Sequence, residues 1–365
     1  MALNIVLLPG DGIGPEVVAE AARLLTRVGE LYHVPMAIAS HAIGGEALER
    51  HGTPLPEATL DACLAADAVL LGAVGHPRYD DRQPAERPEA GLLALRRALG
   101  GFANLRPAIC HAPLAGQTAF RPERVQGADL LIVRELLGGI YFGEPRGYRS
   151  PDEAFNTLTY SRHEVERVAR VAFDLARGRR RKVASVDKAN VLESSRLWRT
   201  VVTEVARSYP EVALEHVFID TCAMRLSTTP ADFDVILADN LFGDILSDQA
   251  AAVAGSLGVL PSAAIGGRVA LYEPVHGSAP DIAGRGLANP IGAIASAAML
   301  LRHTARLPRE AEALERAIEA ALAAGARTRD IAAPGERVLG TREMADAIEH
   351  ALVELHDHHH SYHAV

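Results

Sequence analysis

The 365-residue sequence has few cysteines and few aromatic residues. Cys63, Cys110 and Cys222 are far apart and odd in number, and aromatic side chains make up 5% of the chain. A disulfide framework or a cysteine metal site needs cysteines in even or closely spaced sets, so neither fits. Sparse, separated cysteines are typical of a reducing compartment, and we expect the protein to be cytoplasmic.

The sequence also has no long apolar run and no excess of positive charge. No stretch reaches the roughly 18 apolar residues that span a bilayer, and residues 1–10 lack the basic region of a secretion signal. The 37 Lys and Arg residues against 46 Asp and Glu give a formal net charge of −9. We therefore expect no membrane and no nucleic-acid partner.

The residues that are present indicate an ordinary globular protein. Hydrophobic residues make up 48% of the chain and charged residues 23%, and this length is typical of two domains. Short apolar runs such as residues 68–72 and 233–238 alternate with amphipathic helical stretches along the chain. This alternation predicts an α/β fold.

The first strand, Ile5–Leu8, leads into a glycine-rich turn at residues 10–14 and a helix over about 17–31. A Rossmann dinucleotide site spaces its glycines G-x-G-x-x-G and ends its second strand with an acidic residue. Here the spacing is G-x-G-x-G, and the second strand, Met36–Ser40, ends without a carboxylate. The sequence therefore predicts that the fold is not a Rossmann fold.

A helix predicted from Asn240 to Gly255 carries two aspartates on one face. Asp244 and Asp248 are four residues apart, so their carboxylates lie one turn from each other. Two bare carboxylates about 4 Å apart repel by about 4 kcal/mol at an effective dielectric near 20, and a cation between them removes that repulsion. Oxygen ligands favour Mg²⁺ or Mn²⁺. The alternative is a pair of solvated aspartates on an outer face.

Two other segments each allow two interpretations. A helical face with i, i+3, i+4, i+7 spacing carries Glu89, Leu92, Leu93 and Arg96. By itself this pattern favours a core stripe whose arginine extends to the surface. The loop from His276 to Asn289, with Gly-Ser-Ala-Pro near its start, is either a cradle of backbone amides for phosphates or a turn-rich connection.

Six segments taken together resemble the isocitrate/isopropylmalate dehydrogenase family of β-decarboxylating 2-hydroxyacid dehydrogenases. They follow one another as Gly10–Glu16, Phe102–Pro107, Arg134–Gly143, Val186–Leu192, Asp239–Asp248 and Glu273–Ile282. The resemblance runs in order from Leu3 to about Val353, and it depends on the whole set because no single segment is specific enough.

The resemblance implies a homodimer whose active sites are shared between subunits. Each subunit would have a discontinuous first domain, 1–100 plus 255–365, that binds NAD through loops. The second domain, 101–254, would carry the dimer interface and an arm at about 138–160 that projects from it. The implied reaction is the NAD-dependent oxidation and decarboxylation of 3-isopropylmalate to 4-methyl-2-oxopentanoate, in leucine biosynthesis.

The resemblance also assigns the catalytic and metal-binding residues. Mg²⁺ or Mn²⁺ would be bound by Asp244, Asp248 and Asp220 of the partner subunit, and would act as a Lewis acid. Lys188 of the partner subunit would remove the hydroxyl proton, after losing its own proton. Tyr141 would protonate the enolate carbon that remains after CO₂ leaves.

The remaining family positions bind substrate and cofactor. Arginines would clamp the substrate carboxylates, namely Arg96, Arg106 and Arg134, with Asp220 in the same set. The substrate's side chain would contact Glu89, Leu92, Leu93 and Val191 of the partner subunit. The cofactor set comprises Asn190, His276, Gly277, Ser278, Ala279, Pro280, Asp281, Ile282 and Asn289. The negative charge of Asp281 would repel a 2′-phosphate, which favours NAD over NADP.

The pocket favours an alkyl substrate. At about 0.8 kcal/mol per buried CH₂, an isopropyl group gains roughly 2 kcal/mol, whereas the extra carboxylate of isocitrate would meet two leucines and stay unsatisfied. The alternatives are another 3-substituted malate (an alkylmalate, tartrate or malate), a catalytically silent binding protein, and a metal-dependent lyase or hydrolase. The last of these leaves the loop at 276–289 without a role.

Three stretches fit the family pattern less well. Leu137 stands where the family usually has Thr, and Thr221-Cys222 stand where it has Asn-Ala. The loop from Ser262 to Arg268 looks short. The His-rich end, 356–365, is not informative about the family, and we expect it to be a disordered tail. These departures leave the breadth of alkylmalate substrates open.

Overall fold

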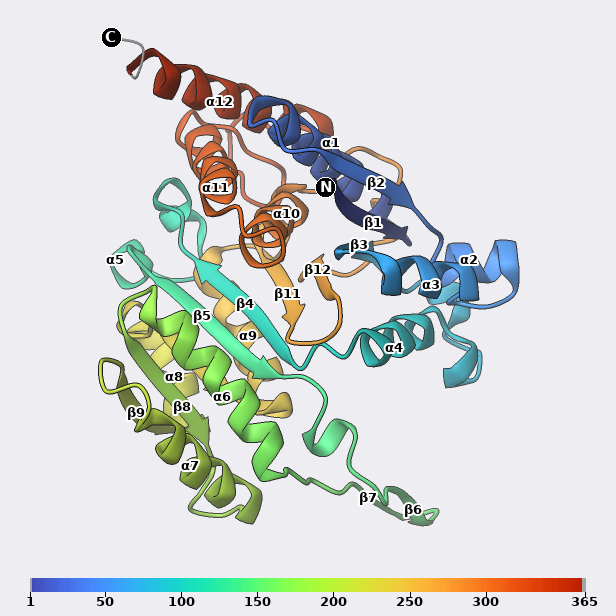
Figure 1. Cartoon of the computed structure of the whole chain (residues 1–365), viewed down its shortest axis with the longest axis vertical. Coiled ribbons are helices and arrows are strands. Elements are labelled where there is room, and N and C mark those ends of the chain that lie inside the picture. The colour runs from blue at the N-terminus through green and yellow to red at the C-terminus, as the bar shows by residue number, and fades with distance from the viewer. Residues whose placement is uncertain (1, 363–365) are drawn as a thin grey trace. The chain divides into compact units, whose positions relative to one another are not determined.

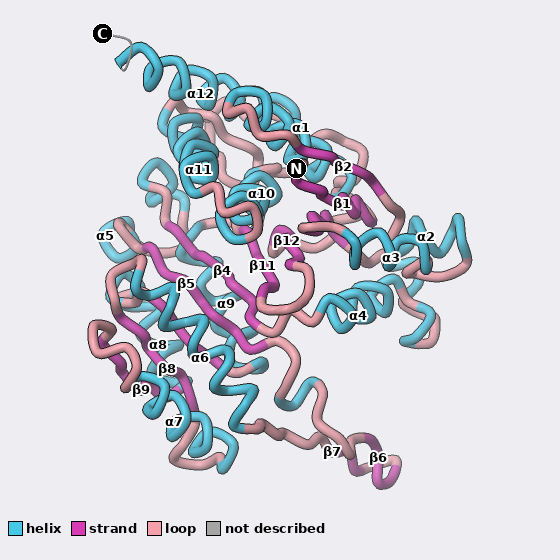
Figure 2. Tube along the Cα trace, in the orientation of Figure 1, coloured by secondary structure: helices cyan, strands magenta, loops and turns pink. Residues whose placement is uncertain are grey.

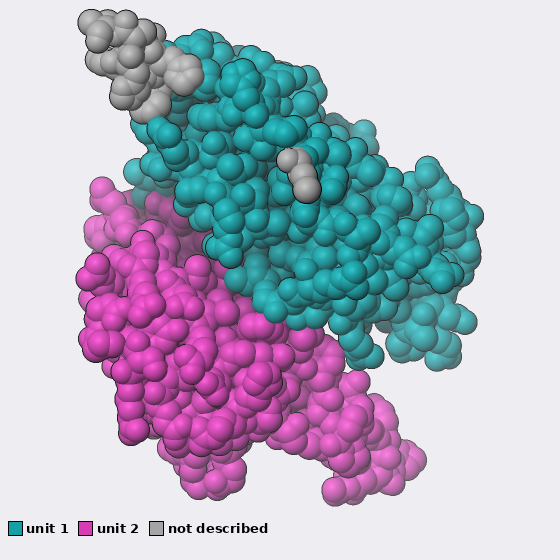
Figure 3. All heavy atoms as spheres, in the orientation of Figure 1, with its two compact units in different colours: residues 1–101, 111–117, 255–365 teal, residues 102–110, 118–254 magenta. Residues whose placement is uncertain are grey.

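A computed structural model describes residues 2–362, except for the side chains of 359–362, and shows strands alternating with helices (Figures 1 and 2). The chain forms two compact units, shown in separate colours in Figure 3. Unit 1 comprises residues 1–101, 111–117 and 255–365, and unit 2 comprises 102–110 and 118–254. Residues 111–117 group with unit 1, although we assigned them to the second domain, because Arg327 Nη2 donates to Pro113 O at 3.2 Å.

Unit 1 has five strands in the order β2-β1-β3-β12-β11. The strand β1 (Leu3–Gly10) pairs in parallel with β2 (Met36–Ser40) and β3 (Ala68–Ala73). The strand β12 (Ala270–Pro274) pairs in parallel with β3 and antiparallel with β11 (Pro261–Ile265). All six residues of β3 are buried, as expected for an inner strand of a sheet covered on both faces.

The helices of unit 1 bury one apolar face each against these strands or against one another. On α1, for example, Val17, Ala21, Leu24 and Val28 are fully buried at helical spacing. The helices are α1 (Gly14–Leu31), α2 (Gly44–His51), α3 (Glu57–Ala65), α4 (Pro88–Leu99), α10 (Ile291–His303), α11 (Pro308–Ala323) and α12 (Thr341–Tyr362).

Unit 2 has the strand order β4-β5-β10-β8-β9. Only β4 runs antiparallel to its neighbour. The bounds are β4 (Ala103–Ile109), β5 (Asp129–Glu135), β10 (Val235–Ala238), β8 (Lys182–Asp187) and β9 (Ala213–Phe218). The helices are α5 (Pro122–Val125), α6 (Arg162–Arg177), α7 (Glu193–Ala206), α8 (Ile219–Thr228) and α9 (Asn240–Ala254).

The helices α6 and α7 pack together on one side of the unit 2 strands, and α8 and α9 pack together on the other (Figure 1). Within the predicted arm, β6 (Gly147–Ser150) and β7 (Glu153–Phe155) form an antiparallel hairpin whose residues are almost all exposed. The structure therefore has a hairpin that projects from unit 2 at this position (Figure 2).

The C-terminal prediction was wrong for residues 356–362, because α12 continues to Tyr362. Buried Met344, Ile348 and Leu352 anchor one face of this helix, and a helix anchored in this way adds further residues at little cost. Residues 363–365 lie outside the described part of the chain. Across residues 2–362, no helix combines the length and the apolar character needed to cross a membrane.

The glycine-rich turn after β1 is organised around Asp11. This carboxylate is 7% exposed and accepts the backbone amides of Gly45 (2.9 Å), Glu46 (3.1 Å) and Gly75 (2.8 Å). It thereby joins the end of β1 to the start of α2 and to the loop after β3. The turn's acidic side chain thus has a structural role.

We expect Asp11→Ala to lower the free energy of unfolding by about 3 kcal/mol or more, because the amides of Gly45, Glu46 and Gly75 all lose this acceptor. Urea unfolding of the full chain, followed by circular dichroism, measures the loss. The control is Asp67→Ala, which removes an acceptor from a single amide, that of Asn4, at the surface, and should cost less than about 1 kcal/mol. Equal losses for the two variants would contradict the role of Asp11.

Candidate active site

The helix α9 begins and ends as its sequence predicts. Asp239 Oδ1 accepts the amide of Phe242 at 2.7 Å, which caps the first turn. Gly255, with φ of +91°, follows the last helical residue in the left-handed conformation that terminates helices. The cap fixes α9 directly after β10, so its first two turns face the end of the neighbouring strand β5.

Asp244 is the carboxylate at which three predicted side chains meet. Its Oδ1 accepts from Arg134 Nη1 at 2.5 Å, and its Oδ2 accepts from the Tyr141 hydroxyl at 2.8 Å. Arg106 Nη1 lies 3.6 Å from Asp244 and also 3.6 Å from Asp248. The structure thus brings together five predicted residues of unit 2, with Asp248 at the exposed side of the cluster.

Arg134 is held in place by Asn240, which the sequence indicated only as a helix cap. Arg134 is 5% exposed, and its Nε and Nη2 donate to the carbonyl and side-chain oxygens of Asn240 at 2.8 and 2.7 Å. The side-chain Nδ2 of Asn240 in turn donates to the backbone carbonyls of Leu136 and Gly138. Asn240 therefore fixes both the arginine and the chain that leads to Tyr141.

Arg134 packs closely against α9 at Gly243, which has no side chain. A Cβ atom at Gly243 would lie 2.6 Å from Arg134 Cγ, so only glycine lets α9 approach the side chain this closely. On the other side of the cluster, Arg106 Nη1 donates to Ser247 Oγ at 2.7 Å and its Nε to Asn104 Oδ1 at 2.8 Å. Both guanidinium groups are therefore oriented by neutral partners as well as by carboxylates.

The Tyr141 hydroxyl is held in its protonated form. Partial burial raises its pKa, and the hydrogen bond to Asp244 and the negative charge of that group raise it further. The positive charges of Arg134 and Arg106 act in the opposite direction but are smaller. Because Tyr141 is also 40% exposed, it is a proton donor that a bound molecule can reach.

Lys188 and Asp220 form a separate pair within the chain. Lys188 follows β8, Asp220 lies in the first turn of α8, and the Nζ to Oδ1 distance is 2.6 Å. This hydrogen bond lowers the pKa of Asp220, which keeps the carboxylate ionised. Beyond Lys188, Asn190 and Val191 are exposed. Within the described side chains of one chain, Asp220 does not join Asp244 and Asp248 in a group of three acidic ligands.

In unit 1, the predicted face of α4 is half-buried at Leu92 and Arg96 and exposed at Glu89 and Leu93, so it is not a core stripe. Leu93 is 55% exposed and Glu89 is also exposed. The helix instead buries the opposite set, Pro88, Gly91, Leu95 and Leu99. Leu92 beside it is half-buried, so Leu93 is the leucine of this face that is open to contact with another molecule.

Arg96, on the same face of α4, has one donor with an acceptor in the described part of the chain and one without. Its Nη2 donates to Glu273 Oε1 at 2.5 Å, and Glu273 is 7% exposed. Its Nε is buried and has no hydrogen-bond acceptor among the described residues. A buried donor without an acceptor is costly, and a ligand carboxylate would satisfy it.

The loop from His276 to Asn289, called here the cofactor loop, packs against the turn after β1. Ile13 N donates to Ser278 O at 2.8 Å, and a Cβ atom at Gly12 would lie 1.9 Å from that same oxygen. This contact explains the second glycine of the G-x-G-x-G turn. The turn therefore supports the loop.

Two predicted cofactor residues of this loop differ in what they offer a ligand. His276 is largely buried, which lowers its pKa, and its Nε2 has no hydrogen-bond partner among the described residues. Asn289 is 5% exposed. Its side-chain Nδ2 donates to Asp330 Oδ2, and its Oδ1 accepts from Ile291 N, both at 3.0 Å. His276 thus has a free polar atom, whereas the Asn289 side chain is occupied in holding the end of the loop.

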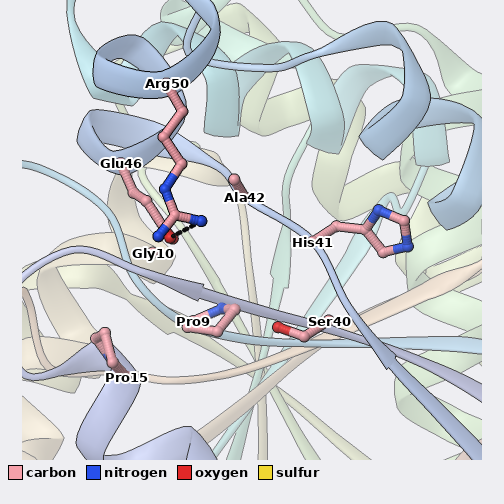
Figure 4. A pocket seen from close by; sticks show the side chains of 8 residues that line it. All are labelled: Pro9, Gly10, Pro15, Ser40, His41, Ala42, Glu46 and Arg50. Atoms are coloured by element: carbon pink, nitrogen blue, oxygen red, sulfur yellow. Dashed lines mark ion pairs between the residues drawn. The ribbon is translucent and has the colours of Figure 1, made fainter.

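A cavity of about 390 Å³ lies at the ends of β1 and β2, where a Rossmann enzyme holds its ribose (Figure 4). Its one carboxylate, Glu46, is paired with Arg50 at 2.9 Å. Pro9 and Pro15 also line it, and proline has no amide to donate. The cavity is therefore poorly suited to a dinucleotide, as the glycine spacing predicted.

The cap of α9 should make stability depend on pH. Burial raises the pKa of Asp239 to about 6 against the lowering effect of the Phe242 amide, and nearby Glu135 raises it further. The unfolded carboxyl ionises near pH 4, so the folded protein loses stability as the pH rises from about 4 to about 6.

Asp239→Asn keeps the capping oxygen and removes this titration. We expect it to raise the free energy of unfolding by about 1–2 kcal/mol at neutral pH and to have little effect near pH 4. Urea unfolding across this pH range measures the difference. A gain that is the same at every pH would show that the charge of Asp239 is not responsible.

Comparisons with known proteins identify the family of the chain. The family described as isocitrate/isopropylmalate dehydrogenase matches residues 4–348. The 3-isopropylmalate dehydrogenase of Shouchella clausii is 52% identical over 96% of this chain and 98% of that protein. That of Pseudomonas savastanoi pv. phaseolicola is 52% identical over 97% of this chain and 100% of that protein.

Solved structures give the same result. The crystal structure of isocitrate dehydrogenase from Methylococcus capsulatus is 37% identical, with a TM-score of 0.84 over 96% of this chain and 99% of that one. A β-decarboxylating dehydrogenase from Thermococcus kodakarensis is 36% identical, with a TM-score of 0.82 over 97% of each chain. The predicted fold class is confirmed, and the chain belongs to the isocitrate/isopropylmalate dehydrogenase family.

Proposed function

We propose that the chain catalyses the NAD-dependent oxidative decarboxylation of 3-isopropylmalate to 4-methyl-2-oxopentanoate in leucine biosynthesis. The observation that carries this proposal is the cluster in which Arg106, Arg134 and Tyr141 meet Asp244. Two arginines suit the carboxylates of a malate. A protonated phenol beside them suits delivery of a proton to carbon.

The carboxylates of α9 fit a divalent cation. Asp244 and Asp248 offer hard oxygen donors on one helix face, and the Asp248 side chain is 72% exposed. We propose that they bind Mg²⁺ or Mn²⁺ together with Asp220 of the partner subunit. When bound, the cation polarises the oxygen of the reacting carbon. Arg106 and Arg134 then neutralise and orient the substrate carboxylates.

The proton steps fall to two side chains, one from each subunit of the proposed dimer. Lys188 of the partner subunit would accept the hydroxyl proton during hydride transfer to NAD. Once CO₂ has left, Tyr141 would protonate the enolate carbon, and its raised pKa ensures that it has a proton to give at neutral pH. Arg96, whose buried Nε lacks an acceptor, would bind a substrate carboxylate.

The cofactor loop is the proposed NAD site. The unpartnered Nε2 of His276 fits a polar group of the dinucleotide. Asp281 is exposed, and its negative charge would oppose the 2′-phosphate of NADP. The remaining loop residues from Gly277 to Ile282 offer the backbone groups, with Asn190 as a further contact.

The leucines of α4, half-buried Leu92 and exposed Leu93, favour 3-isopropylmalate as the substrate. We propose that Leu92, Leu93 and Val191 of the partner subunit enclose the isopropyl group, with Glu89 at the edge of the pocket. An additional carboxylate in the same place would lose its hydration without gaining a partner.

Exposed apolar residues in unit 2 support a homodimer. Met224 on α8 is 59% exposed and Ile245 on α9 is 54% exposed, while Tyr148 of the hairpin is 81% exposed. We propose that a second copy of the chain covers these helices and that active sites are shared between subunits. Cys63, Cys110 and Cys222 are buried and form no disulfide, which supports the proposed cytoplasmic location.

The direct test is NADH formation by the purified chain with NAD, Mn²⁺ and a panel of malates. We expect 3-isopropylmalate to exceed isocitrate, malate and tartrate in kcat/KM by about 100-fold or more. A kcat/KM for isocitrate comparable with that for 3-isopropylmalate would contradict the proposed substrate and favour isocitrate oxidation. The absence of NADH with every member of the panel would contradict the dehydrogenase proposal, and equal kcat/KM for NAD and NADP would overturn the cofactor assignment.

A further inference from the structure

The carboxylate of Glu16 binds a loop that lies far away in the sequence. Glu16 stands in the first turn of α1, and its two oxygens accept the backbone amides of Gly284 and Gly286, the latter at 3.1 Å. Both glycines belong to the cofactor loop. They have φ values of +73° and +63°, a left-handed conformation that glycine adopts freely and that lets two amides point at one anion.

The contact with Glu16 is accompanied by another between the start of α1 and the cofactor loop. The other is the hydrogen bond from Ile13 N to Ser278 O at 2.8 Å, made possible by the missing side chain of Gly12. Ser278 precedes Asp281 and Ile282, and Gly284 follows them. The segment that carries these two proposed NAD contacts is therefore fixed on both sides.

We propose that Glu16 is a positioning residue for NAD binding, which rests on the function proposed above. A loop that is already ordered loses less conformational freedom when its ligand binds. Glu16 contributes by holding the second half of the loop, so that Asp281 and Ile282 are in place before NAD arrives. The acidic end of the Gly10–Glu16 segment thereby acquires a role that its sequence spacing did not indicate.

A simpler role for Glu16 must be distinguished from this one. An acidic side chain in the first turn of a helix interacts favourably with the helix dipole, and that effect needs no loop. If this were its only role, replacing Glu16 would weaken α1 but would not separate NAD binding from substrate binding. The test therefore compares the two ligands and examines the loop itself.

The variants are Glu16→Ala, which removes both acceptors, and Glu16→Gln, which keeps one acceptor oxygen. In the Mn²⁺-containing enzyme we expect Glu16→Ala to raise KM and Kd for NAD by about 10-fold. The kcat and the KM for 3-isopropylmalate should stay within about two-fold of the wild-type values. The KM and Kd of Glu16→Gln for NAD should fall between those of Glu16→Ala and wild type. The control is Glu336→Ala, because this carboxylate also accepts one backbone amide, that of Ala333 at 2.8 Å.

Trypsin reports on the loop without any cofactor, because Arg285 is exposed between the two anchored glycines. We expect cleavage after Arg285 to be several-fold faster in Glu16→Ala than in wild type or Glu336→Ala. Unchanged cleavage in Glu16→Ala overturns the proposal, and so does faster cleavage with an unchanged Kd for NAD. An equal rise in KM for NAD and for 3-isopropylmalate overturns it as well. A wild-type chain that binds no NAD would instead contradict the proposed function.

Discussion

Asp244→Asn is expected to lower kcat/KM for 3-isopropylmalate by about three orders of magnitude or more. The amide keeps an acceptor for Arg134 and has the same shape, so the cluster should remain folded. What it loses is the negative charge that a divalent cation needs, and Lewis-acid stabilisation contributes several kcal/mol to such reactions, with each 1.4 kcal/mol worth about ten-fold in rate.

The measurement has to separate metal binding from structure. Asp244 also neutralises Arg134, whose side chain is 6% exposed, so a loss of stability could imitate a loss of catalysis. We would measure Mn²⁺ affinity and thermal unfolding along with kinetics. The matched control is Asp174→Asn on α6, an exposed aspartate of the same unit that lies 3.6 Å from Arg177. Near-normal activity and Mn²⁺ affinity in Asp244→Asn would remove Asp244 from the metal site.

Local signals in the sequence were sufficient to predict α9 and its position. An apolar strand, a capping aspartate and a terminal glycine are all within 25 residues, and each acts through contacts with its neighbours. The face of α4 could not be decided in the same way. Helical spacing identifies which residues share a face, but whether that face is inside or outside depends on the strands and helices packed around it.

The residues that sequence reasoning missed are those whose partners are distant in the chain. Asn240 holds Arg134 across 106 positions, and Glu16 holds Gly284 across 268. No periodicity or spacing encodes such a contact. The roles of Arg134 and Tyr141 were reached only through the family resemblance, because a lone arginine or tyrosine at the end of a strand has many ordinary explanations.

Lys188→Arg is expected to reduce kcat by about three orders of magnitude, within the range for loss of a general base. Lys182 and Lys188 are the two lysines in a chain that has 37 basic residues. An arginine at position 188 would retain the positive charge and a partner for Asp220, but its guanidinium does not release a proton in proteins. Only the proton-accepting role is therefore removed.

The other lysine provides the matched control. Lys182 is exposed at the start of β8, so Lys182→Arg should leave kcat within about two-fold of wild type. If Lys188→Arg kept more than about a tenth of wild-type kcat, Lys188 would act through its charge alone and the base would have to be sought elsewhere. Lys188→Met, which lacks the charge as well, should be no more active than Lys188→Arg.

The same two substitutions can test whether the sites are shared between subunits. A two-fold symmetric dimer has two sites, and each would combine Asp244 of one subunit with Lys188 of the other. In a mixed dimer of an Asp244→Asn chain and a Lys188→Arg chain, one site carries both substitutions and the other carries neither. Random exchange makes half of the dimers mixed, so activity should return to about a quarter of wild type. Unmixed samples supply the baseline. If mixing restored nothing although mass spectrometry showed mixed dimers, each site would be built from a single chain, and Lys188 would have to act on the Asp244 of its own subunit.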